Sequence, residues 1–276
     1  MEKIGIIGVG AMGSALLERL KLAGARPTAY DCDPVALEAA RSLGVEAASS
    51  SRAVAQAATI IDVVVRTDKE VLDCALGKNG LLEGAQTNAL LLLHSTILPH
   101  TTRKVAEAAR KRNAQVLDAC MLGVPKTVRA GELIFIVGGP TELVERARPH
   151  LLKMGKQVIH MGPLGAGNTG KLIKNLTSAA ETLMMHEALR LGEAEGLKYA
   201  QVLEMLRQVD SGRLLDRWRQ VYDPAEPAPT PRIGRNVFHK DVPLAGELAR
   251  QYGLDIPVIE QLVAAAERLV RDKRRS

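Results

Sequence analysis

A lysine and an asparagine stand four residues apart in the stretch GAGNTGKLIKN, residues 165–175. Lys171, Asn175, Ser178 and Thr182 are spaced four, three and four residues apart, so a helix would place them along one side. A lysine near a helix N-terminus can act as a general base, because that terminus, neighbouring cations and burial lower an amine's pKa toward neutral pH. The alternative is a lysine on a solvated helix face.

The same stretch also resembles two nucleotide-binding patterns. Gly165, Gly167 and Gly170 spell G-x-G-x-x-G, and the run from Gly165 to Lys171 spells most of a P-loop. A dinucleotide site needs a second strand with an acidic end, which does not follow, and a P-loop needs Ser or Thr where this chain has Leu172. We therefore expect no nucleotide here, and we expect the glycines to give room where a ligand meets the start of the helix.

A second glycine pattern, GVGAMG, opens the chain directly after the apolar run KIGII. Gly8 permits a tight turn, Gly10 lets the backbone approach a pyrophosphate, and Gly13 lets helix and strand pack closely. A helical segment, the short strand PTAY and then Asp31 follow, at nearly the spacing expected of the acid that binds the adenine ribose. The order of these elements predicts a dinucleotide site. Because Asp31 and Asp33 would repel a 2′-phosphate, we expect NAD rather than NADP. The alternative is a glycine-rich turn in an α/β protein without a nucleotide.

The elements needed to position these groups alternate along the first part of the chain. We predict an α/β fold: a Rossmann-type, doubly wound parallel sheet in residues 1–162, then a long interdomain helix and an all-α domain in residues 163–276. Further strands are predicted in the stretches 59–65, 88–95, 114–119, 133–139 and 156–162, and helices in 99–113, 140–155, 169–196, 200–210, 242–253 and 256–273. The proline-rich stretch 223–234 is either a mobile lid or a plain surface connection.

Composition excludes several classes of protein. Apolar residues make up 46% and charged residues 25%, as in an ordinary globular enzyme, while 3% aromatic residues argue against stacking on single-stranded nucleic acid. Much of the net charge of +6 lies in the terminal RDKRRS. The start of the sequence leads us to expect no signal peptide, and its apolar runs are too short for us to expect a bilayer-spanning segment. Cys32, Cys74 and Cys120 are far apart and no H-E-x-x-H occurs, which predicts a reducing, cytoplasmic location and no metal site.

Taken together, these motifs resemble the β-hydroxyacid dehydrogenase family, of which 3-hydroxyisobutyrate dehydrogenase is the best known. Four motifs carry the resemblance, in order, over nearly the whole chain: GVGAMG at 8–13, part of the substrate-binding loop at 118–131, G-x-G-x-x-x-K-x-x-x-N at 165–175, and KDVPLA at 240–245. The stretch HSTILP at 94–99 also resembles the family's segment beside the nicotinamide. The resemblance implies hydride transfer between NAD and a small hydroxy acid without a metal.

The resemblance also implies roles for individual residues. Lys171 would be the general acid/base, and Asn175 would orient the same region of the substrate. The expected cofactor-binding residues are Gly8, Gly10, Ala11, Met12, Gly13, Asp31, Arg66, Thr67, Thr96 and Lys240. The expected substrate-binding residues are Ser95, Leu122, Gly123, Val124, Lys171, Asn175 and Ser178.

The substrate loop, DACMLGVPKTVRAG, departs from the family's D-x-P-V-S-G-G. Cys120 replaces the proline, Leu122 replaces the serine and Val124 replaces the second glycine. Loss of the serine hydroxyl implies that the usual carboxylate clamp is changed or moved. Lys126 and Arg129, which we place in this loop, are either a site for a second anionic group or solvated surface charges.

Three functions remain open. The first is an NAD-dependent dehydrogenase of a small 3-hydroxy acid or reductase of its semialdehyde; the second is an imine reductase of the same fold; the third is a non-catalytic NAD-binding relative. Lys171 and Asn175 favour the first. A 6-phosphogluconate dehydrogenase would need a much larger second domain. We expect a small anionic substrate, no nucleic acid or membrane partner, and a homodimer or homotetramer.

Overall fold

The computed structural model of the chain describes residues 2–209, 237–254 and 257–272. The chain forms two compact units, Met1–Lys171 and Leu172–Ser276, which are taken in turn below. The proline-rich stretch 223–234 lies outside the described residues, so the prediction of a lid there is not addressed.

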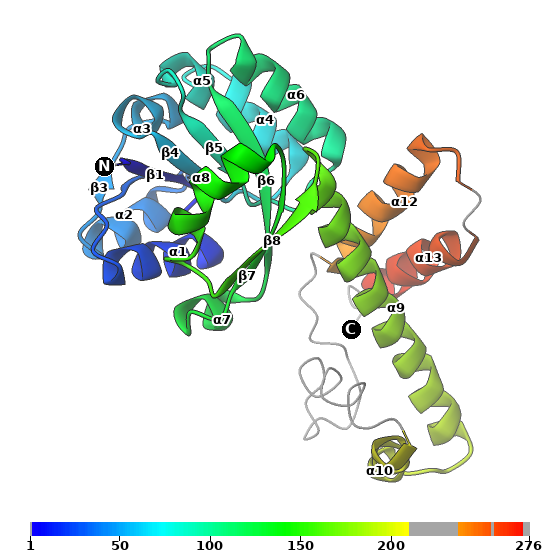
Figure 1. Cartoon of the computed structure of the whole chain (residues 1–276). Helices are drawn as coiled ribbons and strands as arrows, with labels where there is room; N and C mark the ends of the chain where they lie inside the picture. Colours follow the sequence, from blue (N-terminus) through cyan, green and yellow to red (C-terminus); the bar gives the residue numbers. More distant parts are fainter. Residues whose placement is uncertain (1, 210–236, 255–256, 273–276) are drawn as a thin grey trace. The chain divides into compact units, whose positions relative to one another are not determined.

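The N-terminal unit contains one eight-stranded sheet (Figure 1) with the order β3-β2-β1-β4-β5-β6-β7-β8. Its strands are β1 Ile4–Ile7, β2 Thr28–Tyr30, β3 Glu46–Ala47, β4 Ile60–Val63, β5 Leu90–Leu93, β6 Gln115–Leu122, β7 Ile134–Gly138 and β8 Gln157–Gly162. The order reverses between β1 and β4, which is the topology of a Rossmann-type doubly wound sheet. The predicted fold class is confirmed.

One pair of strands differs from the all-parallel prediction. β7 runs antiparallel to β6, with Asp118 opposite Gly138 and Leu122 opposite Ile134, while every other pair is parallel. Only the short helix α7, Pro125–Arg129, lies between the two strands. A parallel return needs a crossover long enough to traverse the sheet, and this connection is too short for one, so the chain turns back on itself.

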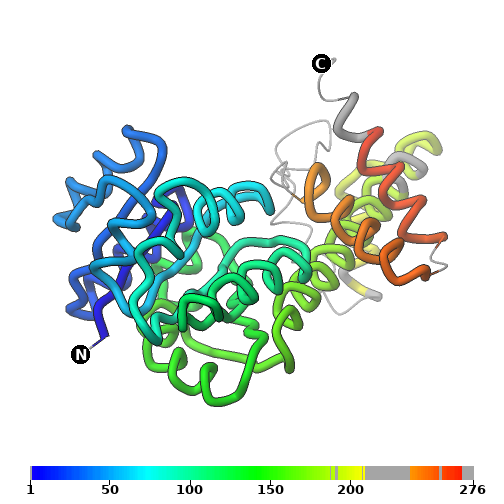
Figure 2. Tube along the Cα trace, turned by 90° about the horizontal axis from the view of Figure 1, so that it is seen from above, coloured from blue at the N-terminus to red at the C-terminus, as the bar shows by residue number. Residues whose placement is uncertain are grey.

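Helices cover both faces of the sheet. One buried cluster joins the sheet to α1, α2, α7 and α8, and the other joins it to α3, α4, α5 and α6. Their bounds are α1 Ala11–Leu22, α2 Pro34–Ser42, α3 Ser51–Ala57, α4 Asp68–Leu76, α5 Leu81–Gly84, α6 Pro99–Arg110 and α8 Thr141–Leu151. Figure 2 shows the trace of this unit from above, with the blue segments that contain β1 to β3 apart from the green segments that contain β7 and β8.

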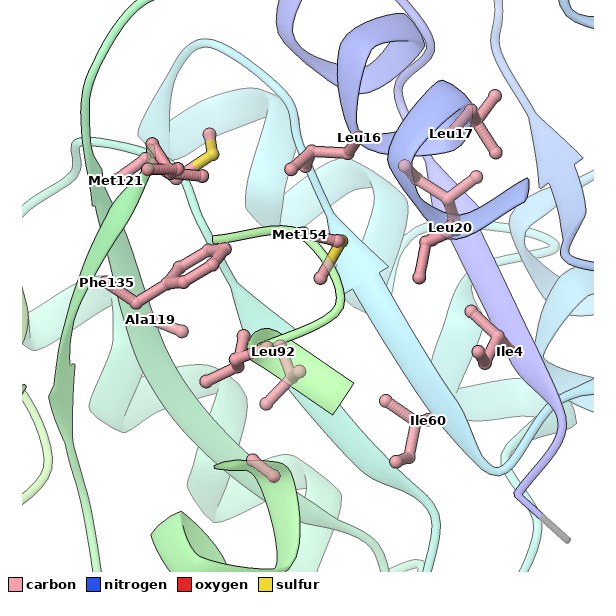
Figure 3. Close-up of a cluster of buried hydrophobic side chains, with 14 of the residues drawn as sticks. Ile4, Leu16, Leu17, Leu20, Ile60, Leu92, Ala119, Met121, Phe135 and Met154 are labelled. Carbon is pink, nitrogen blue, oxygen red and sulfur yellow. The ribbon is translucent and has the colours of Figure 1, made fainter. Parts of the chain in front are cut away.

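The packing of α1 shows why this part of the sequence folds as predicted. Leu16, Leu17 and Leu20 recur at helical spacing and are fully buried, and Figure 3 shows them beside apolar side chains of the strands. The helix ends before Gly24, whose φ of +77° is the left-handed conformation that glycine adopts without strain. Burial of the leucine stripe fixes how the N-terminus of α1 meets the end of β1.

The described part of the second unit is helical. The long helix α9, Ala166–Ala194, starts in the first unit and continues into the second, where α10 Tyr199–Val209, the π-helix η1 Val237–Asp241, α12 Val242–Gln251 and α13 Pro257–Asp272 follow. Leu183 of α9 packs with Phe238, Val242 and Ala266 in a small apolar core. Of the helices in the described ranges, none is long and apolar enough to cross a bilayer.

Candidate active site

The predicted cofactor and substrate residues of the first unit follow four parallel strands. Gly8–Gly13 follow β1, Arg66 and Thr67 follow β4, Ser95 and Thr96 follow β5, and Leu122–Val124 stand at the end of β6. Because these strands are parallel, their carboxyl ends lie at one edge of the sheet. Ligands of doubly wound sheets bind at this edge, where the strand order reverses, here between β1 and β4.

The three glycines after β1 differ in what a side chain would meet. A Cβ at Gly8, whose φ is +90°, would lie 2.3 Å from the carbonyl oxygen of Val64, and one at Gly13 would lie 2.0 Å from that of Gly8. Both positions therefore need glycine for the packing of the protein itself. A Cβ at Gly10 would meet no protein atom within 4 Å. Packing does not explain Gly10, whereas a ligand that touches the backbone there does.

The N-terminus of α1 suits an anionic group. Gly10 is the N-cap, no side chain caps the helix, and its first turn contains no acidic residue. Ala11 is exposed and Met12 half-buried at this end. The uncapped N–H groups and the helix dipole favour a negative charge. The pyrophosphate of a dinucleotide fits these residues.

Asp31, at the end of β2, holds the glycine turn. Its carboxylate accepts hydrogen bonds from the backbone N–H of Val9 at 2.7 Å and of Asp33 at 2.9 Å, one on each oxygen. A carboxylate has about four acceptor positions, so these two bonds leave capacity for the ribose hydroxyls. Asp33 caps α2 by accepting from the N–H of Val35. Asp31 was predicted only to bind the ribose. In the structure it also holds the glycine turn in place.

Arg66 and Thr67 link β4 to α4. The Arg66 side chain is 81% exposed, and its guanidinium lies 3.2 Å from the carboxylate of Glu70 one turn on. Thr67 caps α4 by accepting from the N–H of Glu70. The exposed guanidinium leaves Arg66 accessible for the predicted cofactor contact, while the oxygen of Thr67 is used within the fold.

Ser95 and Thr96 lie after β5, at the same edge. Ser95 is buried, and its hydroxyl donates to the carbonyl of Val65 at 2.6 Å. In this arrangement its proton serves the loop after β4, and only its lone pairs can face a ligand. Thr96 is half-buried. The structure therefore does not direct a Ser95 proton toward a substrate carboxylate.

A buried charged cluster lies directly before Ser95. His94 donates from Nδ1 to the carbonyl of Ala119 at 2.6 Å and from Nε2 to Asp62 at 2.8 Å, while His150 donates to the other Asp62 oxygen at 2.8 Å. Burial raises the pKa of the Asp62 carboxyl, but the charge and the N–H of His150 and the N–H of His94 outweigh burial and hold that pKa well below its usual range.

The start of α9 is fixed by a carboxylate on β6. Asp118 is buried and accepts from the N–H of Gly165 at 2.7 Å and of Asn168 at 2.8 Å, so it caps the helix from a distant part of the chain. Burial raises the pKa of the Asp118 carboxyl, and these N–H donors act in the opposite direction without outweighing it. A Cβ at Gly167 would lie 2.8 Å from Asp118 Oδ2, so this glycine allows the helix to approach the sheet. Gly167 is therefore needed for packing, whereas the sequence analysis expected the glycines of this stretch to give room for a ligand.

Lys171 lies in the second turn of α9. Its Nζ donates to the carbonyl of Met121, near the end of β6, at 2.6 Å. The side chain is half-buried rather than on a fully solvated face. Lys171 therefore lies beside Leu122 and Gly123, which were predicted to bind substrate.

The segment that was predicted to be a substrate loop consists largely of regular secondary structure. β6 continues through Leu122 and α7 begins at Pro125, because the antiparallel pairing with β7 extends the strand. Gly123 and Val124, between these elements, are exposed. The guanidinium of Arg129 binds both carboxylate oxygens of Glu18 on α1, at 2.8 and 2.9 Å, and the side chain is 48% exposed. This pairing favours the surface charge over the anion site among the two alternatives for Arg129.

Cys120, which replaces the proline of the family pattern, lies inside β6. Its Sγ accepts from Nδ2 of Asn168 at 3.3 Å and donates to the carbonyl of Ser95 at 3.6 Å, while Asn168 Oδ1 accepts from Thr102. Cys120 is fully buried. It therefore joins α9 to β5 and β6 and does not reach the exposed edge.

The remaining candidates lie in the second unit. Asn175 is buried, and its Nδ2 donates to Asp241 Oδ2 at 2.7 Å. Lys240 Nζ lies 3.4 Å from the other oxygen of Asp241. The Ser178 hydroxyl donates to the carbonyl of Lys174 on its own helix, as Ser and Thr often do in helices. Asp241 was missed from the sequence, although its place directly after Lys240 in the KDVPLA motif was a signal.

Comparison with known proteins identifies the group to which the chain belongs. The family model described as the NAD binding domain of 6-phosphogluconate dehydrogenase matches residues 3–162, and that described as NAD-binding of NADP-dependent 3-hydroxyisobutyrate dehydrogenase matches residues 165–275. The 3-hydroxyisobutyrate dehydrogenase of Pseudomonas aeruginosa is 35% identical over 252 residues, 89% of this chain and 84% of that protein. The chain belongs to the β-hydroxyacid dehydrogenase family.

The names of two further relatives both mention L-serine. The NAD-dependent L-serine dehydrogenase of P. aeruginosa is 33% identical over 268 residues, 94% of this chain and 89% of that protein. The solved structure of Mycobacterium tuberculosis 3-hydroxyisobutyrate dehydrogenase with L-serine has a TM-score of 0.88 and 26% identity, covering 99% of this chain and 94% of that one. The β-hydroxyacid dehydrogenase is thus an NAD(P)-binding oxidoreductase that acts on the CH–OH group of hydroxy acids.

Proposed function

We propose that this β-hydroxyacid dehydrogenase interconverts a small 3-hydroxy acid and its semialdehyde with NAD as cofactor, and that Lys171 is the general acid/base. One observation carries the catalytic assignment: Lys171 Nζ is held 2.6 Å from the Met121 carbonyl, beside the segment predicted to bind substrate. Asn175 lies one turn further along α9, on the same side of the helix.

The lysine can move the proton in either direction. When bound, NAD supplies a hydride acceptor. During oxidation the substrate hydroxyl proton passes to the neutral amine of Lys171, and the ammonium that forms donates to the Met121 carbonyl. During reduction the ammonium returns its proton to the substrate oxygen. The carbonyl holds Nζ in place in both states, because an amine and an ammonium are both donors.

The proposed substrate is a small anion whose carboxylate is bound differently from the family pattern. Leu122 has no hydroxyl, and the Ser95 proton is used by Val65. We therefore assign the carboxylate to the exposed backbone around Gly123. The names of the relatives support 3-hydroxyisobutyrate and L-serine as first candidates, since both are hydroxy acids of similar size.

NADH absorbance tests this proposal directly. The panel comprises 3-hydroxyisobutyrate, L-serine and other 3-hydroxy acids with their semialdehydes, together with sulfonate and phosphonate analogues, each with NAD and NADP. We expect turnover with at least one 3-hydroxy acid and a preference for NAD, because Asp31 repels a 2′-phosphate. Absence of turnover across the panel with both cofactors would refute the proposed substrate class.

We also propose a homodimer or homotetramer in the cytoplasm. Ile173, Met184 and Met205 are large apolar side chains that are more than half exposed on α9 and α10, and such faces favour association. The three widely separated cysteines support a reducing compartment. Light scattering at several protein concentrations measures the oligomeric state, and a monomer at all of them would contradict the proposal.

A further inference from the structure

Asp241 joins two helical segments, and its carboxylate contacts a distant residue. It is the last residue of η1, directly before α12, and its φ of −73° and ψ of −37° are helical, unlike the extended backbone of a capping residue, so it makes no side-chain cap hydrogen bond. Asp241 is 4% exposed, and its carboxylate accepts from the amide of Asn175, 66 residues away in the chain. The carboxylate therefore makes a long-range contact and does not cap the helix that follows it.

The contact determines the orientation of the Asn175 amide. A carboxylate only accepts hydrogen bonds, so the Asn175 atom 2.7 Å from Asp241 Oδ2 must be the nitrogen. The carbonyl oxygen of the same amide then points away from Asp241. Without a charged acceptor, the two ends of an asparagine amide are nearly equal in shape and can exchange places.

The second oxygen of Asp241 faces another candidate residue. Lys240 Nζ lies 3.4 Å from Asp241 Oδ1, and the Lys240 side chain is mostly buried, with 24% exposed. One carboxylate thus lies between the proposed catalytic amide and the predicted cofactor-binding lysine. All three residues belong to the second unit, so the arrangement is independent of how that unit meets the first.

We propose that Asp241 is a positioning residue that fixes Asn175 with its carbonyl oxygen, rather than its NH2 group, available to the substrate. The inference rests on the proposed function, because it assigns a task to Asn175. A carbonyl accepts from a hydroxyl or an ammonium group, and it does not pair with a carboxylate or an aldehyde oxygen. Because the single proton of the reacting hydroxyl goes to Lys171, Asn175 so oriented favours substrates that carry a second donor next to the reacting carbon, such as the ammonium group of a 2-amino-3-hydroxy acid.

The first test uses the wild-type protein and does not depend on turnover. Nitrogen-15 NMR of the side-chain amides, with Asn175→Ser to assign the signal, should show an Asn175 amide proton that is shifted downfield and protected from exchange. Asp241→Asn should abolish the shift, because the neutral partner is a weaker acceptor. An Asn175 amide that exchanges as fast as exposed amides in the wild type would overturn the contact. Since this reading needs no variant at Asp241, misfolding of that variant leaves the test intact.

The second test is kinetic and uses a matched control. We expect Asp241→Asn to lower kcat for the best alcohol substrate of the panel by about tenfold or more at saturating cofactor, as a misplaced group near reacting atoms can cost about 100-fold. Glu247→Gln makes the same chemical change at an exposed position of α12 and should leave kcat unchanged. The melting temperatures of both variants should differ only slightly from that of the wild type.

Lys240→Met separates the two contacts of Asp241. Loss of Lys240 should raise the KM for NAD by a larger factor than it lowers kcat, whereas Asp241→Asn should lower kcat by a larger factor than it raises the KM for NAD. If both variants reduce kcat equally, Asp241 acts through Lys240 and the assignment to Asn175 is wrong. If the wild type shows the protected amide but turns over no hydroxy acid, the contact stands and the proposed function fails instead.

Discussion

Exchange of Gly10 for alanine tests whether the first glycine turn holds a pyrophosphate. Gly10 has φ −62°, which any residue adopts, and its added Cβ would meet no protein atom within 4 Å. The cost to folding should be about 0.5 kcal/mol, the loss from a poorer N-cap residue. A methyl group at the place where the ligand touches the backbone should nevertheless weaken NADH binding at least about tenfold, or about 1.4 kcal/mol.

Gly13→Ala is the matched control, because it adds the same atom where the protein itself fills the space. The Cβ would lie 2.0 Å from the Gly8 carbonyl oxygen, roughly 1.4 Å closer than ordinary contact. Such overpacking costs about 1–3 kcal/mol, and about 1 kcal/mol returns from the higher helix propensity of alanine. The melting temperature should fall by about 2–4 °C for each kcal/mol lost.

Thermal melting and NADH fluorescence titration of the two variants decide the question. The structure predicts that Gly10→Ala melts like the wild type and binds NADH poorly, while Gly13→Ala melts early. If Gly10→Ala bound NADH as tightly as the wild type, the pyrophosphate would not lie at this turn. If it melted as early as Gly13→Ala, the steric argument would be wrong.

Three further changes probe other parts of the site. Arg129→Ala should leave the substrate KM within about twofold, because its guanidinium already pairs with both carboxylate oxygens of Glu18; a tenfold rise would place Arg129 in the substrate site. Asp31→Ser should raise the preference for NADPH over NADH by about tenfold or more, since it removes the charge that repels a 2′-phosphate; unchanged selectivity in NADH and NADPH titrations would remove that role. Asp62→Asn should cost about 1.5–3 kcal/mol at neutral pH, because the buried hydrogen bonds from His94 and His150 lose their charged acceptor. The pKa of Asp62 is lowered in the fold, so its stabilisation is present above the ordinary value and is lost as the pH falls below about 4. Urea unfolding should show the difference in unfolding free energy between the wild type and Asp62→Asn narrowing below that pH, and a widening difference would contradict the lowered pKa of Asp62.

The features that the sequence predicted well depend on residues close together in the chain. The turn at Gly8–Gly13 follows an apolar run and precedes a helical stripe, so strand, turn and helix can each be read within about 20 residues. The spacing of Lys171 and Asn175 predicts a shared helix side for the same reason. Local periodicity carries this information because backbone geometry repeats every two or 3.6 residues.

The features that were missed depend on contacts between distant residues. The apolar residues of β7 show that a buried strand exists there, but an apolar run has no direction, so its antiparallel pairing was invisible. Arg129 was left open between an anion site and a surface charge because its partner, Glu18, is 111 residues away. Likewise nothing near Asp118 indicates that it caps a helix beginning after Gly165. Such pairings are determined by the topology of the sheet and not by neighbours in sequence.

Turnover of Lys171→Ala tests the central claim most directly. With the best substrate of the panel and saturating NAD, the variant should lose at least about 100-fold in kcat, the usual contribution of a general acid/base. The affinity of the variant for NADH should match that of the wild type, because Asp31 and the glycine turn form hydrogen bonds that do not include Lys171 or its partner Met121. Equal turnover in the two proteins would show that another group moves the proton, and the assignment of Lys171 would be wrong.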